Sequence, residues 1–116
     1  MEIIKAADFI DSGFSEDDAL LLIPYIDAAK DANIEFVVDF SGVHYFTTLF
    51  FSTALTRLVG ELREEEYRRR VHVRNLSESG AETYKHALDY AIEFFKKTAE
   101  ERESTHMNIR KVMEDI

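Results

Sequence analysis

The 116-residue sequence contains no cysteine, which excludes disulfide bonds, thiolate zinc sites and a cysteine nucleophile. It has no tryptophan, one proline and four glycines, so little of the chain can serve as a flexible linker. No apolar run approaches the roughly 20 residues that cross a bilayer. The first five residues lack the basic-then-apolar order of a signal peptide. We therefore expect a cytoplasmic protein without membrane segments.

Basic side chains are in the minority, because 14 Lys and Arg stand against 23 Asp and Glu and give a net charge of −9. Residues 1–39 carry most of this imbalance, with two basic and ten acidic side chains, or −8. Such an acidic surface repels phosphate backbones and disfavours nucleic-acid binding. The one basic cluster (Arg68, Arg69, Arg70 and Arg74) follows residues 64–66, which are all Glu. We interpret it as a solvated turn of paired charges, and a patch for phosphate or an acidic partner is the alternative.

Apolar periodicity divides the chain into alternating strands and helices. An extended lead-in is expected at residues 3–4 and 9–10, and Ser15 with Asp18 has the spacing of a capping box. The helix that follows should reach about Ala32, with a kink at Pro24 or a late start near Leu22. Further elements are a strand at 34–40, a helix at 48–62, a strand at 70–74 and a helix at 81–103.

This order of strands and helices predicts a small α/β sandwich, with helices packed on a short mixed sheet. The length suits a single core, so residues 1–103 are expected to form one domain. Residues 104–116 follow as an amphipathic C-terminal tail.

Two features are expected to leave surface for contacts with other chains. Phe94 and Phe95 are adjacent on one helix and point in different directions, so some aromatic surface remains for a partner or a second copy. The tail carries an apolar stripe at helical spacing: Ile109, Val112, Met113 and Ile116. We expect it to pack against a second copy, giving a homo-oligomer, or to cover the open side of the sheet.

Motifs for catalysis or metal binding are missing from the sequence. The four histidines are scattered, and no two lie at i, i+4 spacing on one helix. There is no glycine-rich phosphate loop and no Gly-x-Ser-x-Gly turn. We therefore predict a protein that is not an enzyme and that carries no metal and no cofactor.

Asp39 is the most prominent polar residue of the centre, because it ends the apolar strand at 34–40, where sites of α/β proteins often form. We interpret Asp39, Ser41 and Gly42 as a turn or pocket, in which the carboxylate accepts hydrogen bonds from the backbone of residues 41–43. An enzyme or nucleotide binder with Asp39 in its pocket is a further alternative.

Residues 37–50 read VVDFSGVHYFTTLF: a strand ending in Asp39, then Gly42-Val43, a threonine pair and Phe50 at the head of a helix. This segment resembles a STAS-like family of small bacterial proteins, which carry part of the fold of anti-sigma factor antagonists. The resemblance covers roughly residues 14–76. A full antagonist has Asp-Ser-Ser-Gly-Leu where this chain has Thr-Thr-Leu-Phe-Phe, so a threonine stands in place of the phosphorylatable serine.

The resemblance implies a regulatory protein that acts by protein–protein binding, with partner switching controlled by phosphorylation. Its partner in such systems is often a kinase-like ATPase. Thr47 and Thr48 are the candidate phosphoacceptors, and a helix N-cap is the structural alternative for either hydroxyl. Partner contacts are predicted from the residues that follow them: Leu49, Phe50 and Phe51. A competing hypothesis is an acidic inhibitor or accessory protein, whose residues 1–39 occupy a basic site on its target.

Overall fold

The computed structural model describes the backbone of residues 1–114 and the side chains of residues 1–97. Its strands are β1 (Glu2–Lys5), β2 (Ser12–Gly13), β3 (Phe36–Asp39), β4 (His44–Phe46) and β5 (Val71–Arg74). Its helices are α1 (Glu16–Asp31), α2 (Thr48–Phe51), α3 (Leu58–Arg70) and α4 (Glu78–Glu114). A short 3-10 turn, η1, spans Ala6–Asp8, and a π-helical turn, η2, spans Ser52–Thr56.

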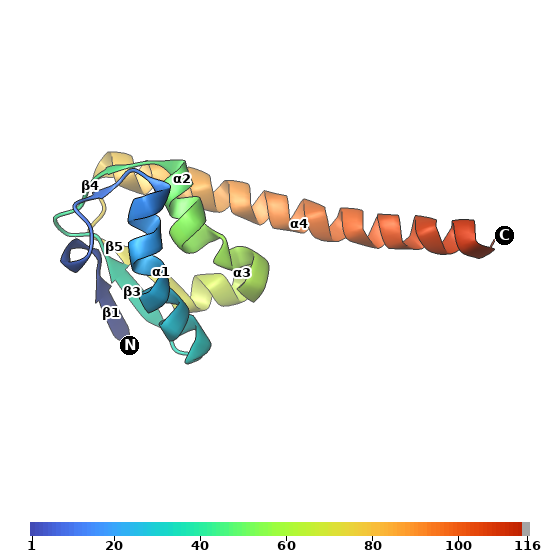
Figure 1. Ribbon diagram of the computed structural model, residues 1–116, viewed down its shortest axis with the longest axis horizontal. Coiled ribbons are helices and arrows are strands. Elements are labelled where there is room, and N and C mark those ends of the chain that lie inside the picture. The colour runs from blue at the N-terminus through green and yellow to red at the C-terminus, as the bar shows by residue number, and fades with distance from the viewer. Residues whose placement is uncertain (115–116) are drawn as a thin grey trace.

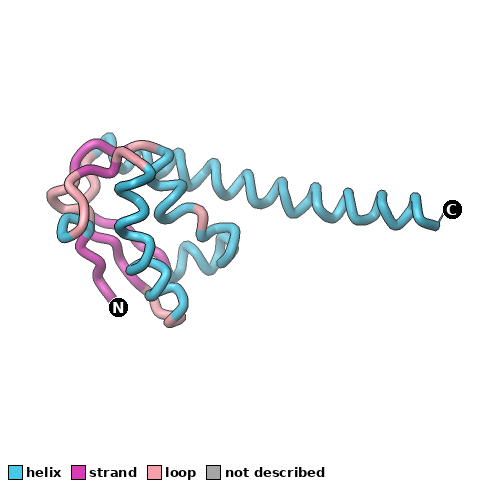
Figure 2. The backbone as a smooth tube through the Cα atoms, viewed as in Figure 1, coloured by secondary structure: helices cyan, strands magenta, loops and turns pink. Residues whose placement is uncertain are grey.

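The main sheet has three parallel strands in the order β1-β3-β5 (Figure 1 and Figure 2). Its register aligns Val38 with Ile4 on one side and with Val73 on the other, so one face of the sheet is apolar. The short strands β2 and β4 pair separately. The predicted α/β class, with helices on a short sheet, is confirmed, and the described strand pairs are all parallel. Sequence reasoning missed β2 and β4.

Helix α1 begins where its capping box predicts. Ser15 Oγ accepts the backbone N–H of Asp18 at 3.2 Å, and the Asp18 carboxylate accepts the N–H of Ser15 at 3.1 Å. The alternative of a late start near Leu22 was wrong, since the helix runs from Glu16 through Pro24 to Asp31. The inner face of α1 is buried in the core: Ala19, Leu22, Ile26 and Ala29.

The core beside β3 is aromatic. The Phe46 and Phe51 rings stack with centroids 5.4 Å apart, and Phe40 meets Phe51 edge-on at 5.8 Å. The ring of Tyr84 in α4 packs edge-on against Phe51, with ring centroids 5.2 Å apart. Helix α2 is therefore covered by the sheet aromatics and by α4, so that Phe50 and Phe51 are both fully buried. The prediction that these two rings contact a partner is corrected: they belong to the core.

The helix predicted at 48–62 is interrupted and longer than expected. After α2 the chain forms η2, and α3 then continues to Arg70, with a left-handed φ of 69° at Arg63. The solvated turn expected at the basic cluster is corrected, because the three arginines at 68–70 form the last turn of α3. Opposite charges one helical turn apart stabilise a helix. Arg68 and Glu64 form such a pair, at 3.4 Å.

Helix α4 begins three residues before its predicted start, at Glu78, where Ser77 Oγ accepts the N–H of Gly80 at 3.1 Å. The hydroxyl groups of Tyr84 in α4 and Tyr67 in α3 form a hydrogen bond, with 2.8 Å between the two oxygens. The helix continues to pack against the core as far as Phe95, and beyond that residue α4 extends away from the globule (Figure 1). The side chains of the predicted tail 104–116 lie outside the described residues. Within the described part, no helix has both the length and the apolar character that a membrane crossing requires.

Candidate functional site

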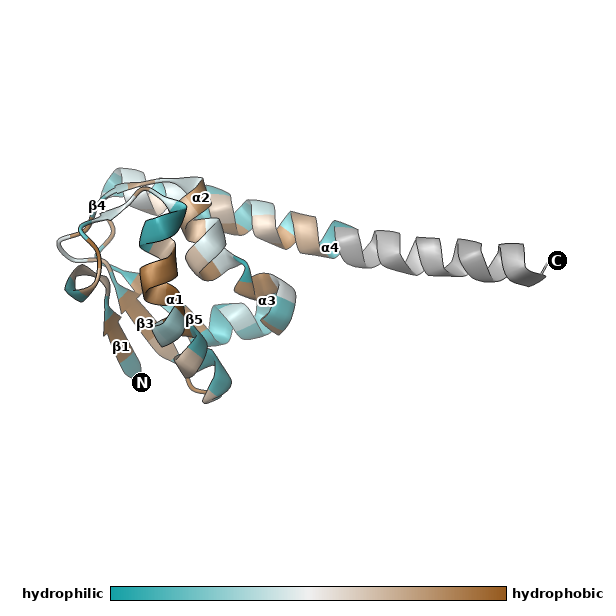
Figure 3. Ribbon diagram, in the orientation of Figure 1, coloured by the Kyte–Doolittle hydropathy of each residue, from teal (hydrophilic) through white to brown (hydrophobic). Residues whose placement is uncertain are grey.

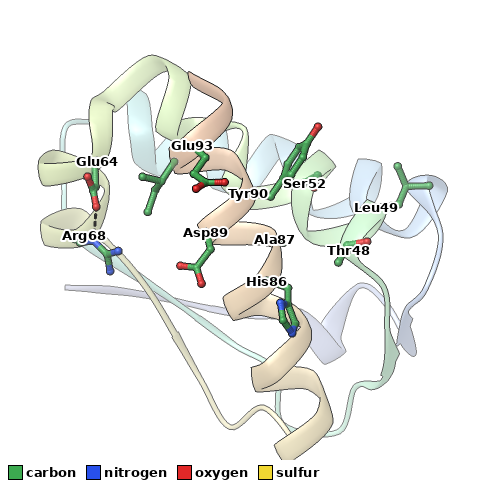
Figure 4. A pocket seen from close by; sticks show the side chains of 11 residues that line it. Thr48, Leu49, Ser52, Glu64, Arg68, His86, Ala87, Asp89, Tyr90 and Glu93 are labelled. Carbon is green, nitrogen blue, oxygen red and sulfur yellow. Dashed lines mark hydrogen bonds and ion pairs between the residues drawn. The ribbon is translucent and has the colours of Figure 1, made fainter. Parts of the chain in front are cut away.

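A groove of about 940 Å³ lies on the surface where α2, α3 and α4 meet. Figure 4 shows Thr48, Leu49 and Ser52 on one side of α4, and Glu64 and Arg68 on the other. The α4 residues that line it are His86, Ala87, Asp89, Tyr90, Ile92 and Glu93. Two of the predicted site residues, Thr48 and Leu49, therefore belong to this groove.

The side of the groove toward α2 exposes large apolar side chains beside the polar Thr48 and Ser52. Leu49 is 55% exposed and Tyr90 is 67% exposed, although both are large apolar side chains. Phe94, one turn further along α4, is half-exposed and stacks on Tyr90 with ring centroids 6.1 Å apart. We call Leu49, Tyr90 and Phe94 the α2–α4 patch. An exposed apolar patch with a polar rim is typical of a surface that binds another protein.

The side of the groove toward α3 is charged. Arg68 is paired with Glu64, and Asp89 and Glu93 lie one turn apart on α4. Within the described residues, no group of three or more His, Asp or Glu side chains converges closely enough to hold a metal ion. This side of the groove supplies a polar rim to the α2–α4 patch.

Thr47 is the N-cap of α2. Its Oγ1 accepts the backbone N–H of Phe50 at 3.1 Å and donates to the carbonyl oxygen of Phe14 at 2.6 Å. Its backbone N–H donates to the carbonyl of Gly13 at 3.0 Å. The Thr47 hydroxyl therefore fixes the start of α2 to the loop that precedes α1, as the N-cap alternative predicts.

Thr48 has a different environment from its neighbour. It is the first residue of α2, it is exposed, and it lines the groove beside Leu49. The sequence alone does not distinguish the two threonines, but the structure gives them different roles. Thr47 caps the helix, and Thr48 presents its side chain at the groove.

Asp39 anchors the turn after β3. Its Oδ1 accepts the N–H of Ser41 at 3.0 Å and the Nδ2 amide of Asn75 at 2.9 Å, and its Oδ2 accepts Arg74 Nη2 at 3.3 Å. The Asn75 amide, the Ser41 N–H and Arg74 hold the pKa of this carboxyl well below its usual range, against the opposing effect of burial. Gly42 completes the turn with φ of 82°, which favours glycine.

The predicted backbone contact of Asp39 with Ser41 is present, whereas its contacts with Arg74 and Asn75 were missed. Arg74 ends β5 and Asn75 follows it directly, and β5 is parallel to β3, so that their side chains meet Asp39 at one edge of the sheet. Asp39 is not among the residues that line the groove. The turn and the groove are therefore separate features.

Sequence reasoning also missed Tyr90. It lies off the apolar stripe of its helix, and an aromatic side chain on the polar face of an amphipathic helix is the signal that was available. The expectation that some aromatic surface remains is confirmed, because Phe94 is half-exposed while Phe95 packs against the core.

Comparison with known families gives a match to the centre of the chain. The model of a STAS-like domain of unknown function (DUF4325) matches residues 21–81. This span includes Asp39, both threonines and Leu49. No curated protein and no solved structure matches the chain.

Proposed function

Since the chain belongs to the family of STAS-like domains, we propose that it is a non-catalytic regulatory protein that binds a partner protein at the groove beside α2. The observation that carries this proposal is the exposure of Leu49 and Tyr90 on the two helices that form the groove. Fully burying a large exposed apolar side chain is favourable by about 1.5–3 kcal/mol, and each of these two still has more than half of its surface to bury.

A protein partner suits this surface better than a small ligand. The groove is open to solvent, and its apolar residues project from it as exposed side chains, whereas small-molecule sites enclose most of their ligand. The charged pair Glu64–Arg68 lies on the opposite side of α4, where the rim of an interface would be hydrated.

Phosphorylation of Thr48 is the proposed control of this binding. The γ-phosphoryl group of ATP would pass to the side-chain oxygen of Thr48, releasing ADP and the hydroxyl proton. The phosphate adds a charge of about −1.5 to −2 beside the α2–α4 patch, where a docked partner removes water. Because the desolvated charge opposes docking, the modified protein releases its partner. By the family resemblance, the proposed partner is a kinase-like ATPase.

The partner is identified by photocrosslinking from a photoreactive residue at position 49. A photoreactive residue at Ser41, an exposed position in the turn after β3 that does not line the groove, is the matched control. A kinase-like ATPase captured at position 49 and not at position 41 supports the proposal, and capture at position 41 alone contradicts it.

Thr48→Glu is expected to weaken binding of the purified partner at least tenfold while leaving the melting temperature unchanged or slightly raised. The added charge opposes desolvation at the interface, but at the first position of a helix it is stabilising by about 0.3–1 kcal/mol. Isothermal titration calorimetry gives the affinity, and circular dichroism gives the melting temperature.

Thr47→Glu is the matched control, because it removes the cap and the hydrogen bond to Phe14 and is therefore expected to lower the melting temperature. If Thr48→Glu folds and binds as the wild type does, the contact lies elsewhere. The acidic surface of residues 1–39 then becomes the better candidate, and binding to it would weaken steeply with ionic strength.

A further inference from the structure

The outer face of α1 is apolar, which is unusual for a helix at the surface. Residues 19–26 read ALLLIPYI and contain no charged side chain over two helical turns. Leu22 and Ile26 face the core, but Leu20 is 52% exposed and Leu21 is 54% exposed. A helix on the surface of a globular protein normally turns polar side chains outward, and one that is apolar all round is normally buried.

The exposed residues of this face follow one another along the helix. They are Asp17, Leu20, Leu21, Pro24, Tyr25 and Ala28. Figure 3 shows the hydrophobic segment of α1 on the outside of the globule, turned toward the viewer. Tyr25 stacks on Phe9 with ring centroids 4.1 Å apart, which fixes one border of the face. The face lies on a different helix from the α2–α4 patch.

The net charge around this face is negative. Glu16 and Asp17 are exposed in the first turn of α1, and Asp31 is exposed at its end. Lys30, the one basic residue of the helix, is mostly covered and pairs with Glu61 of α3 at 2.9 Å and with Asp31 at 3.6 Å. Arg57 pairs with Asp27 at 2.6 Å. Three carboxylates therefore share two cations at this end of α1, which leaves it negative. A second copy packed antiparallel about a two-fold axis would place Glu16 and Asp17 near the Asp31 of its neighbour. Like charges so placed disfavour a homodimer and favour a basic partner.

We propose that the outer face of α1 is a second docking surface, which takes an amphipathic helix of another protein whose apolar stripe is flanked by Lys or Arg. Leu20 and Leu21 supply the apolar contact, and the acidic residues at the two ends of α1 attract the basic flanks. The proposal is independent of the groove beside α2, because it uses neither Thr48 nor the α2–α4 patch.

The probe is a fluorescent peptide of roughly 18 residues, or five helical turns, with leucine at i, i+3 and i+4 positions and lysine on both flanks. The comparison peptide has glutamate in place of every lysine. Fluorescence anisotropy measures their binding to the full chain. The lysine peptide is expected to bind at least tenfold more tightly than the glutamate peptide, and to weaken as salt is added.

The variant Leu20→Ser with Leu21→Ser is expected to weaken binding of the lysine peptide at least tenfold, while Leu49→Ser, its matched control, leaves binding unchanged. Both variants remove exposed leucine, so both should fold. A second variant, Glu16→Gln with Asp17→Asn, retains the apolar face and is expected to reduce the salt dependence of binding.

Four results would overturn the proposal. The first is that the wild type does not bind the lysine peptide, and the second is that Leu49→Ser weakens binding as much as the α1 variant does. The third is a result of sedimentation velocity in which the wild type self-associates and the α1 variant is monomeric. That result would assign the face to a second copy of this chain. Equal binding of the two peptides counts against the proposal in the same way.

Discussion

Replacing Arg70 by methionine is expected to lower the free energy of unfolding by about 3 kcal/mol. The side chain of Arg70 is buried, and its guanidinium group donates to the carbonyl oxygen of Lys30 at 2.8 Å and to that of Ile34 at 3.4 Å. These carbonyl groups belong to the last turn of α1 and to the loop that follows it. Methionine retains most of the volume, but leaves both oxygens without this donor.

Arg69→Met is the matched control, because the Arg69 side chain is 73% exposed and pairs with Glu66 at the surface. Surface pairs of this kind contribute little, so the control is expected to change stability by less than about 0.5 kcal/mol. Urea denaturation followed by circular dichroism measures both variants. Equal midpoints for the two variants would show that Arg70 does not hold the end of α1.

Arg70 illustrates what the sequence could not reveal. The run of three arginines reads as a solvated cluster, and for Arg68 and Arg69 the paired, exposed side chains agree with that interpretation. Arg70 is instead buried against residues about 36–40 positions away in the sequence. The residue at which α3 ends and β5 begins decides which of the three arginine side chains points into the core. No local sequence pattern specifies that residue.

The parts of the fold that were predicted depend on local signals. The capping box of Ser15 and Asp18 starts α1, and the apolar run at 34–40 contains β3. The alternation at 71–74 places Val71 toward the core, as expected. Each of these signals lies within a few residues of the element that it specifies, so a single sequence is sufficient to find it.

The candidate site was predicted only in part, for a similar reason. Thr48 and Leu49 follow directly from the motif after β3, and both line the groove. Their neighbours Phe50 and Phe51 were wrongly assigned to the surface. The burial of α2 depends on its packing against Phe40 after β3, Phe46 of β4 and Tyr84 of α4. Tyr90 comes from a helix that begins about thirty residues later, and only the fold brings it to the same groove.

Asp39→Asn is expected to lower the free energy of unfolding by about 2 kcal/mol at pH 7. The carboxylate accepts from Ser41, Arg74 and Asn75, and thereby joins the end of β3 to the end of β5. An amide has only one acceptor oxygen, and its NH₂ group would face a donor. Asp11→Asn is the matched control, because Asp11 is exposed, and it is expected to leave the stability unchanged within about 0.5 kcal/mol.

The pH dependence of this effect separates a charged anchor from a merely well-packed side chain. Because the folded-state pKa of Asp39 lies below the value of about 3.9 of an unfolded chain, its contribution is fully present above that pH. The contribution is lost as the pH falls through the unfolded value toward the folded one, where both states take up the proton. The gap in melting temperature between the wild type and Asp39→Asn is therefore expected to be wide at pH 7 and to narrow steadily below about pH 4. A gap of constant width from pH 7 to pH 3, measured by differential scanning calorimetry, would show that the negative charge of Asp39 does not hold the two strands together.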